Sequence, residues 1–114
     1  MKLHPRHVIA AVVVLPALLA VDAARAADEE AARALARQSG CFKCHAVSKK
    51  MDGPSYKEVA AKYRGKPDAQ ARLTEHITSG KKVKLEDGSE EEHKVVKSKD
   101  PAQIRNLVDW ILSL

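Results

Sequence analysis

The stretch CFKCHAV, residues 41–47, holds both cysteines of the chain, Cys41 and Cys44, and places His45 directly after the second one. Two thiols and an imidazole at this spacing suit several kinds of site. A disulfide across two intervening residues closes a very small loop and removes little chain entropy, so it fits a redox-active pair better than a structural one. Zinc usually takes four ligands from two separated pairs, whereas this chain has a single pair and scattered histidines. The remaining kind of site is covalent haem attachment, whose signature is C-x-x-C-H.

The chemistry of haem attachment accounts for this spacing. Two thiols add to two vinyl groups on one porphyrin edge, so they must lie a few residues apart, and the adjacent imidazole can then turn under the ring to reach the iron. A thioredoxin-like motif needs a βαβ setting, but the rest of this chain has helical patterns. We therefore expect one haem c bound through Cys41 and Cys44, with His45 as a ligand of its iron. The haem would also stabilise a small domain whose own core is thin.

The N-terminus has the pattern of a secretory signal peptide. Lys2 and Arg6 precede an apolar run at residues 8–21, and Ala24-Arg25-Ala26 supplies small residues at the two positions that a signal peptidase reads. The alternative is a retained membrane anchor, but the run is shorter than the roughly 20 residues that span a bilayer. We expect residues 1–26 to be removed. The mature domain, residues 27–114, would then be periplasmic, without stable membrane insertion.

Charge and composition exclude some functions. The chain has 20 Lys and Arg residues and 15 Asp and Glu residues, mixed along the sequence, and no basic block lies beside aromatic residues. Nucleic-acid binding therefore has little support. No acid–base pair and no nucleophile with a partner is evident, so we do not expect an enzyme.

Four segments of the mature domain have helical patterns. The first segment starts with acidic residues and ends with a glycine, both of which are typical of helix ends. The last segment begins with Asp100 as a cap, followed by Pro101. Asp68 is the expected cap of the third. The segment 81–99 is expected to be a loop, with a possible small hairpin at Asp87-Gly88. The four helical segments are residues 28–40, 55–65, 68–80 and 100–114.

In the order of these features, residues 28–114 resemble a small bacterial class I cytochrome c. The resemblance is carried by the helix before CFKCH, the stretch HAVSKKMDGPSYKEVAAKY, the helix that ends at Gly80 and the C-terminal LVDWILSL. It implies an all-α, cytochrome c-like fold with about four helices around one covalent haem. It also implies electron transport between redox partner proteins. In the family, the exposed haem edge near the cysteines docks partners, and Lys43, Lys49 and Lys50 lie near that edge here.

The resemblance also implies specific contacts. The first and last helices should cross, so that Leu35 or Ala36 meets Leu107, Trp110 or Ile111. The carbonyl of Pro54 should accept a hydrogen bond from the second ring nitrogen of His45, which would fix the orientation of that ligand.

The chain departs from the family at the second iron ligand. Family members usually carry a methionine between the third and fourth helices, but this chain has only Met1 and Met51, and the segment 81–99 contains His93 instead. We expect His93 to ligate the iron opposite His45, which should lower the reduction potential relative to methionine ligation. The alternatives are an open or weakly ligated iron, or ligation by Met51 or His76. A weak or displaceable ligand would instead suit a protein that binds or senses a small gas.

Overall fold

The computed structural model describes Met1 and residues 26–114. The expected signal peptide therefore lies outside the described residues, apart from its two ends. Within the described part of the chain, no helix is both long enough and apolar enough to cross a membrane.

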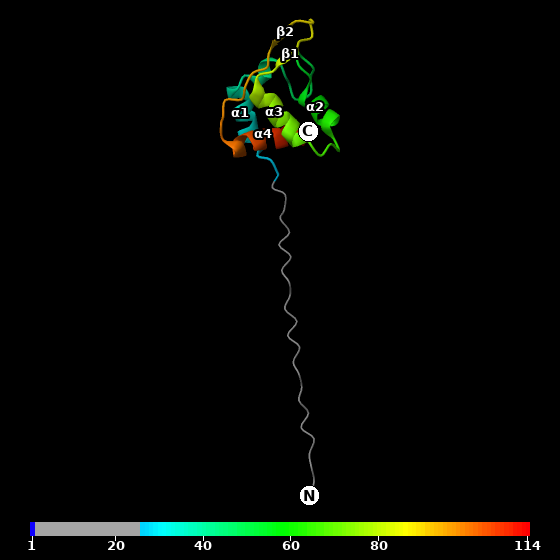
Figure 1. Ribbon diagram of the computed structural model, residues 1–114, viewed down its shortest axis with the longest axis vertical. Helices are drawn as coiled ribbons and strands as arrows, with labels where there is room; N and C mark the ends of the chain where they lie inside the picture. Colours follow the sequence, from blue (N-terminus) through cyan, green and yellow to red (C-terminus); the bar gives the residue numbers. More distant parts are fainter. Residues whose placement is uncertain (2–25) are drawn as a thin grey trace.

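Four α-helices and one hairpin make up the domain (Figure 1). The helices occupy the four segments that the sequence predicts, so the expected all-α fold is confirmed. Their bounds are α1 (Glu29–Gln38), α2 (Tyr56–Tyr63), α3 (Ala69–Ser79) and α4 (Pro101–Leu112). A short 3₁₀ helix, η1 (Cys41–Lys43), follows α1, and strands β1 (Lys82–Lys84) and β2 (Glu90–Glu92) form the hairpin.

Helix α4 is the centre of the core, because α1, α2 and α3 all pack against it. Its residues Leu107 and Val108 are fully buried, and Leu35 and Ala36 of α1 belong to the same apolar cluster. The expected packing of the first helix on the last is therefore present. Burying a large apolar side chain contributes about 1.5–3 kcal/mol, so this contact is a main source of stability.

The helix starts follow the sequence signals with one exception. The carboxylates of Asp28 and Asp100 accept backbone N–H bonds at 3.0 and 2.9 Å, and Ser55 forms a reciprocal capping box. Asp68 stands at the cap position of α3, but its side chain makes no cap bond. Its carboxylate instead lies 2.6 Å from Arg72, one turn along the helix. The predicted cap position of Asp68 is therefore correct, but its carboxylate pairs with Arg72 and makes no cap bond.

Polar bonds fix the outer helices on α4. Asn106 accepts from the backbone N–H of Asp28 at 2.8 Å and donates to the carbonyl of the same residue at 2.9 Å. Gln70 of α3 donates to Asp109 of α4 at 2.7 Å. These bonds set the positions of α1 and α3 along α4. Helix α3 is therefore held in a fixed position in the domain.

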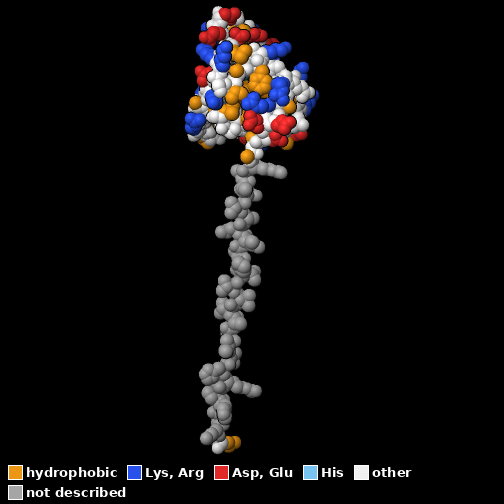
Figure 2. Space-filling view, turned by 180° about the vertical axis from the view of Figure 1, so that it is seen from behind, with side chains coloured by type: hydrophobic (Ala, Val, Ile, Leu, Met, Phe, Trp, Pro, Cys, Tyr) orange, Lys and Arg blue, Asp and Glu red, His pale blue; other side chains and the backbone are white. Residues whose placement is uncertain are grey.

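The hairpin predicted at Asp87-Gly88 is present. Its strands are antiparallel, and lysines of β1 lie opposite glutamates of β2, an arrangement that favours pairing. Gly88 has a φ of 86°, a conformation that glycine adopts without strain. Acidic side chains gather at this end of the domain (Figure 2).

Candidate haem site

A cavity of about 530 Å³ lies between the helices, the segment after η1 and the hairpin. This volume is within the usual range of ligand sites, roughly 300–1,000 Å³. Both cysteines and all three histidines of the described residues line it, and its walls are apolar. The apolar residues of the wall are Val59, Leu73, Ile77, Val83, Leu85, Leu107 and Ile111.

The two cysteines are half-buried, free thiols at the edge of this cavity. The turn of η1 brings them together, because the carbonyl of Cys41 accepts from the N–H groups of Cys44 and His45 at 3.3 and 3.0 Å. Burial raises the pKa of the Cys41 thiol, and a hydrogen bond with Tyr56 offsets only part of that effect. A raised pKa makes this thiol a poorer nucleophile at neutral pH.

The zinc alternative lacks a suitable donor set. Across residues 26–114, no group of three or more histidine, cysteine or carboxylate side chains is placed to hold a metal ion. Tetrahedral zinc sites need three or four such donors. A haem iron needs fewer donors from the protein, because the porphyrin supplies four nitrogens.

His45 is held on several sides. Its Nδ1 lies 2.7 Å from the carbonyl oxygen of Pro54. A carbonyl can only accept, so the proton is on Nδ1 and the lone pair of Nε2 is free for a metal. The ring lies directly on Gly53, where a Cβ would come within 2.5 Å of its Cε1. Tyr56 stacks on His45 with ring centres 5.3 Å apart and planes 19° apart.

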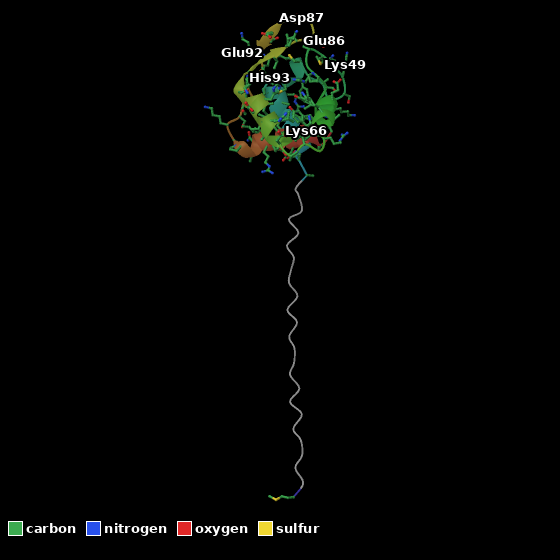
Figure 3. The ribbon with its side chains drawn as sticks, turned by 45° about the vertical axis from the view of Figure 1, so that its right-hand side comes forward. Lys49, Lys66, Glu86, Asp87, Glu92 and His93 are labelled. Carbon is green, nitrogen blue, oxygen red and sulfur yellow. The ribbon has the colours of Figure 1, made fainter. Side chains whose placement is uncertain are left out.

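His93 comes from the far side of the cavity, directly after β2. Its backbone N–H donates to the carbonyl of Lys81 at 3.0 Å, which continues the hairpin by one pair. Figure 3 shows His93 nearer the helices than Glu86 and Asp87 of the hairpin turn. Burial, together with the smaller effects of the neighbouring His76 and His45, lowers the pKa of His93 to about 4, so the ring is neutral at neutral pH. Neutral imidazole is the form that binds metals.

The separation of His45 and His93 fits an iron between them. Their ring centres are 6.1 Å apart. Imidazole nitrogens bind metals at about 2 Å and lie about 1.2 Å from the ring centre, so two rings on opposite sides of one metal have centres roughly 6.3 Å apart. The thiols, the two imidazoles and the apolar walls therefore fit a haem attached at Cys41 and Cys44.

The other candidate ligands differ in position. Met51 is 38% exposed and is not among the residues that line the cavity. His76 does line it, and its ring centre lies 4.1 Å from that of His93. The sequence interpretation favoured a helix-face position for His76. Helical spacing could have placed it better, since it follows buried Leu73 by three residues and precedes buried Ile77 by one.

Charged residues of both signs line the cavity. The basic ones are Lys50, Lys62, Lys84 and Lys94, and the acidic ones are Asp52, Glu58, Glu91 and Glu92. Lys43, Lys49 and Lys50, the expected docking lysines, are all exposed. Lys50 also pairs with Glu86 at 3.0 Å, which joins the loop after His45 to the hairpin turn.

Comparison with known proteins identifies one family. The sequence model of the family described as Cytochrome c matches residues 29–114. The crystal structure of the class 1 cytochrome MtoD from Sideroxydans lithotrophicus ES-1 is similar, with 62% identity, a TM-score of 0.74 and coverage of 77% of this chain and 97% of that one.

Two curated relatives give different coverage. The chain is 44% identical over 57 residues to cytochrome c-551 of Pseudomonas aeruginosa, a match that covers 50% of this chain and spans only 55% of that relative. Cytochrome c2 of Rhodocyclus tenuis is 36% identical, with coverage of 77% of this chain and 94% of the relative.

Proposed function

This chain belongs to the cytochrome c family, and from that premise we propose that it carries single electrons between redox partner proteins in the periplasm. Members of the family bind one haem c covalently, and Cys41 and Cys44 fit the attachment motif. The haem supplies the one-electron chemistry, because its iron changes between the ferric and ferrous states. The proposal extends to the residues that hold the haem, the partners that it serves and the compartment.

The observation that carries the proposal is the separation of 6.1 Å between the rings of His45 and His93 across one cavity. In this proposal, Cys41 and Cys44 form the thioethers, and His45 and His93 ligate the iron from opposite sides. Pro54 sets the tautomer of His45 through the bond at 2.7 Å. If His45 and His93 both ligated the iron, they would leave no ligand position open for a small gas, which favours transport over sensing.

The surrounding side chains suit electron transfer. The apolar walls exclude water from the iron, and His45 is fixed by Pro54, Gly53 and Tyr56, so its position need not change with the oxidation state. Two nitrogen ligands stabilise ferric iron more than a nitrogen and a thioether do. We therefore expect a reduction potential below that of a methionine-ligated relative, and no sulfur-to-iron band in the red region of the ferric spectrum.

Electron transport and gas binding can be separated with the purified holoprotein. A reductive titration should consume one electron per haem, and the spectrum of the ferrous protein should change only slowly when carbon monoxide is added, because a histidine must first leave the iron. Rapid and complete carbon monoxide binding by the ferrous protein would contradict the proposal and would support a gas-binding function instead.

The periplasmic location rests on the pattern of residues 1–26. Mass spectrometry of protein from a periplasmic extract should give a mature chain that begins at Ala27. A chain that still carries Met1 and the apolar run would show a retained anchor.

A further inference from the structure

We propose that His76 is a positioning residue that holds His93 in the orientation needed to ligate the iron. This inference rests on the proposed ligation by His45 and His93. His76 itself would contact the ligand and not the metal. Nothing in the residue pattern of the haem motif assigns His76 such a role, since it lies on a different helix.

The distances between ring centres show that His93 is related differently to His45 and to His76. Its ring centre is 6.1 Å from that of His45, a spacing that leaves room for a metal, and 4.1 Å from that of His76, which does not. His76 and His93 are therefore in direct ring contact, with their planes inclined at 48°. A ring packed at this distance limits rotation of His93 about its side-chain bonds.

His93 has few other means of support. Its Nδ1 is buried and has no hydrogen-bond partner among the described residues, whereas the corresponding atom of His45 is bonded to Pro54. The residues on either side of His93, Glu92 and Lys94, are exposed and line the same cavity as His93. Metal-bound histidines usually depend on such outer contacts for their orientation. The contact with His76 supplies this support from outside the hairpin.

Helix α3 is well suited to present a fixed ring. His76 lies between Leu73 and Ile77, which are 5% and 8% exposed and pack in the core. The bond from Gln70 to Asp109 fixes the helix on α4, and the backbone N–H of Val96 donates to the carbonyl of Ile77 at 2.9 Å. The segment that carries His93 is therefore fastened to the same helix that carries His76.

Two substitutions separate the effect of the ring from a general effect on the helix. His76→Phe keeps an aromatic ring against His93, and His76→Ala removes it. Arg72→Ala is the matched control, because Arg72 is an exposed residue of the same helix whose side chain bonds to Asp68. All three are studied as holoproteins, by the ferric electron paramagnetic resonance spectrum and by the rate of carbon monoxide binding to the ferrous form. That rate is limited by dissociation of His93.

We expect His76→Ala to accelerate carbon monoxide binding by about tenfold, the lower range for loss of an outer contact to a metal ligand. The g-values should also shift, because they depend on the angle between the axial imidazole planes. His76→Phe should stay within a few-fold of the wild type, and Arg72→Ala should match it. An unchanged rate and spectrum in His76→Ala would overturn the proposal, as would equal changes in His76→Phe and His76→Ala.

His93→Ala distinguishes this inference from the ligand assignment beneath it. If His93 is the ligand, that variant loses the low-spin, two-imidazole signal whether or not His76 matters. A low-spin signal that survives in His93→Ala and disappears in His76→Ala would show that His76 is itself the ligand. That result would overturn both the positioning role and the assignment of His93.

Discussion

Two segments face each other across the cavity, and they hold their histidines in different ways. The proximal segment, residues 41–54, folds on itself: the N–H of Gly53 donates to Cys44 at 2.8 Å, and His45 bonds to Pro54. The distal segment, residues 81–93, is a hairpin with an exposed turn, and the ring of His93 depends on a contact with α3. One proposed ligand is fixed by its sequence neighbours and the other by a distant element.

This difference affects how firmly each histidine keeps its position. A ligand fixed by local bonds keeps its position while the rest of the domain moves, whereas a ligand on a hairpin can leave when the hairpin opens. Short two-stranded hairpins are marginal without packing. We therefore infer that the proximal side secures the haem and that the distal side sets how easily the iron becomes accessible.

The largest expected effect comes from removing the covalent attachment on the proximal side. With Cys41→Ala and Cys44→Ala combined, acid–acetone extraction should release all haem from the protein, whereas the wild type should retain it. Cys44→Ala alone should lower the yield of holoprotein but keep one thioether. Complete extraction of haem from the wild type would contradict covalent attachment altogether.

A methyl group at Gly53 tests the packing of His45. In Gly53→Ala the new Cβ would lie 2.5 Å from Cε1 of His45, so the ring or the loop must shift. We expect the free energy of unfolding to fall by about 1–3 kcal/mol and the ferric spectrum to change. Chemical denaturation and absorption spectroscopy measure both.

Gly65→Ala is the control for this change. Gly65 has a φ of 76°, but a Cβ at this position would have no atom within 4 Å, so the substitution should cost about 1–2 kcal/mol from backbone strain alone. Its haem spectrum should match the wild type. An altered spectrum in Gly65→Ala, or an unaltered one in Gly53→Ala, would contradict the idea that only the glycine in contact with His45 affects the haem.

A change in the hairpin turn tests the distal side. Gly88 has a φ of 86°, so Gly88→Ala should destabilise the hairpin by about 1–2 kcal/mol. His93 should then leave the iron more often, and stopped-flow measurements should show carbon monoxide binding to the ferrous protein accelerated by a few-fold. The ligation by His45 should be unaffected. If carbon monoxide bound no faster, His93 would not depend on the hairpin.

The smallest effect concerns the ion pair that joins the two segments. Lys50 and Glu86 are 3.0 Å apart, and their side chains are 58% and 61% exposed. Exposed pairs contribute about 0–1 kcal/mol, so Glu86→Gln should change stability only slightly. The difference from the wild type should vanish at high salt, where the pair is screened. A loss that persists at high salt would mean that Glu86 acts by something other than charge.

The same difference explains what the sequence could predict. The motif at Cys41–His45, the four helices and the Asp87-Gly88 turn depend on neighbouring residues, and the structure contains each of the helices and the hairpin. Asp68 occupies the predicted cap position of α3, but its carboxylate pairs with Arg72, one turn away, and makes no cap bond. The position of His76 beside His93 depends on how α3 sits on α4, and no local pattern contains that information.

Pulsed electron paramagnetic resonance on the ferric holoprotein is the sharpest test of the proposed ligation of the iron by both His45 and His93. With isotope-labelled histidine, the wild type should show strong coupling to two imidazole nitrogens, and His93→Ala should show coupling to one. His76→Ala should still show two. A single coupled imidazole in the wild type, or two in His93→Ala, would contradict the claim.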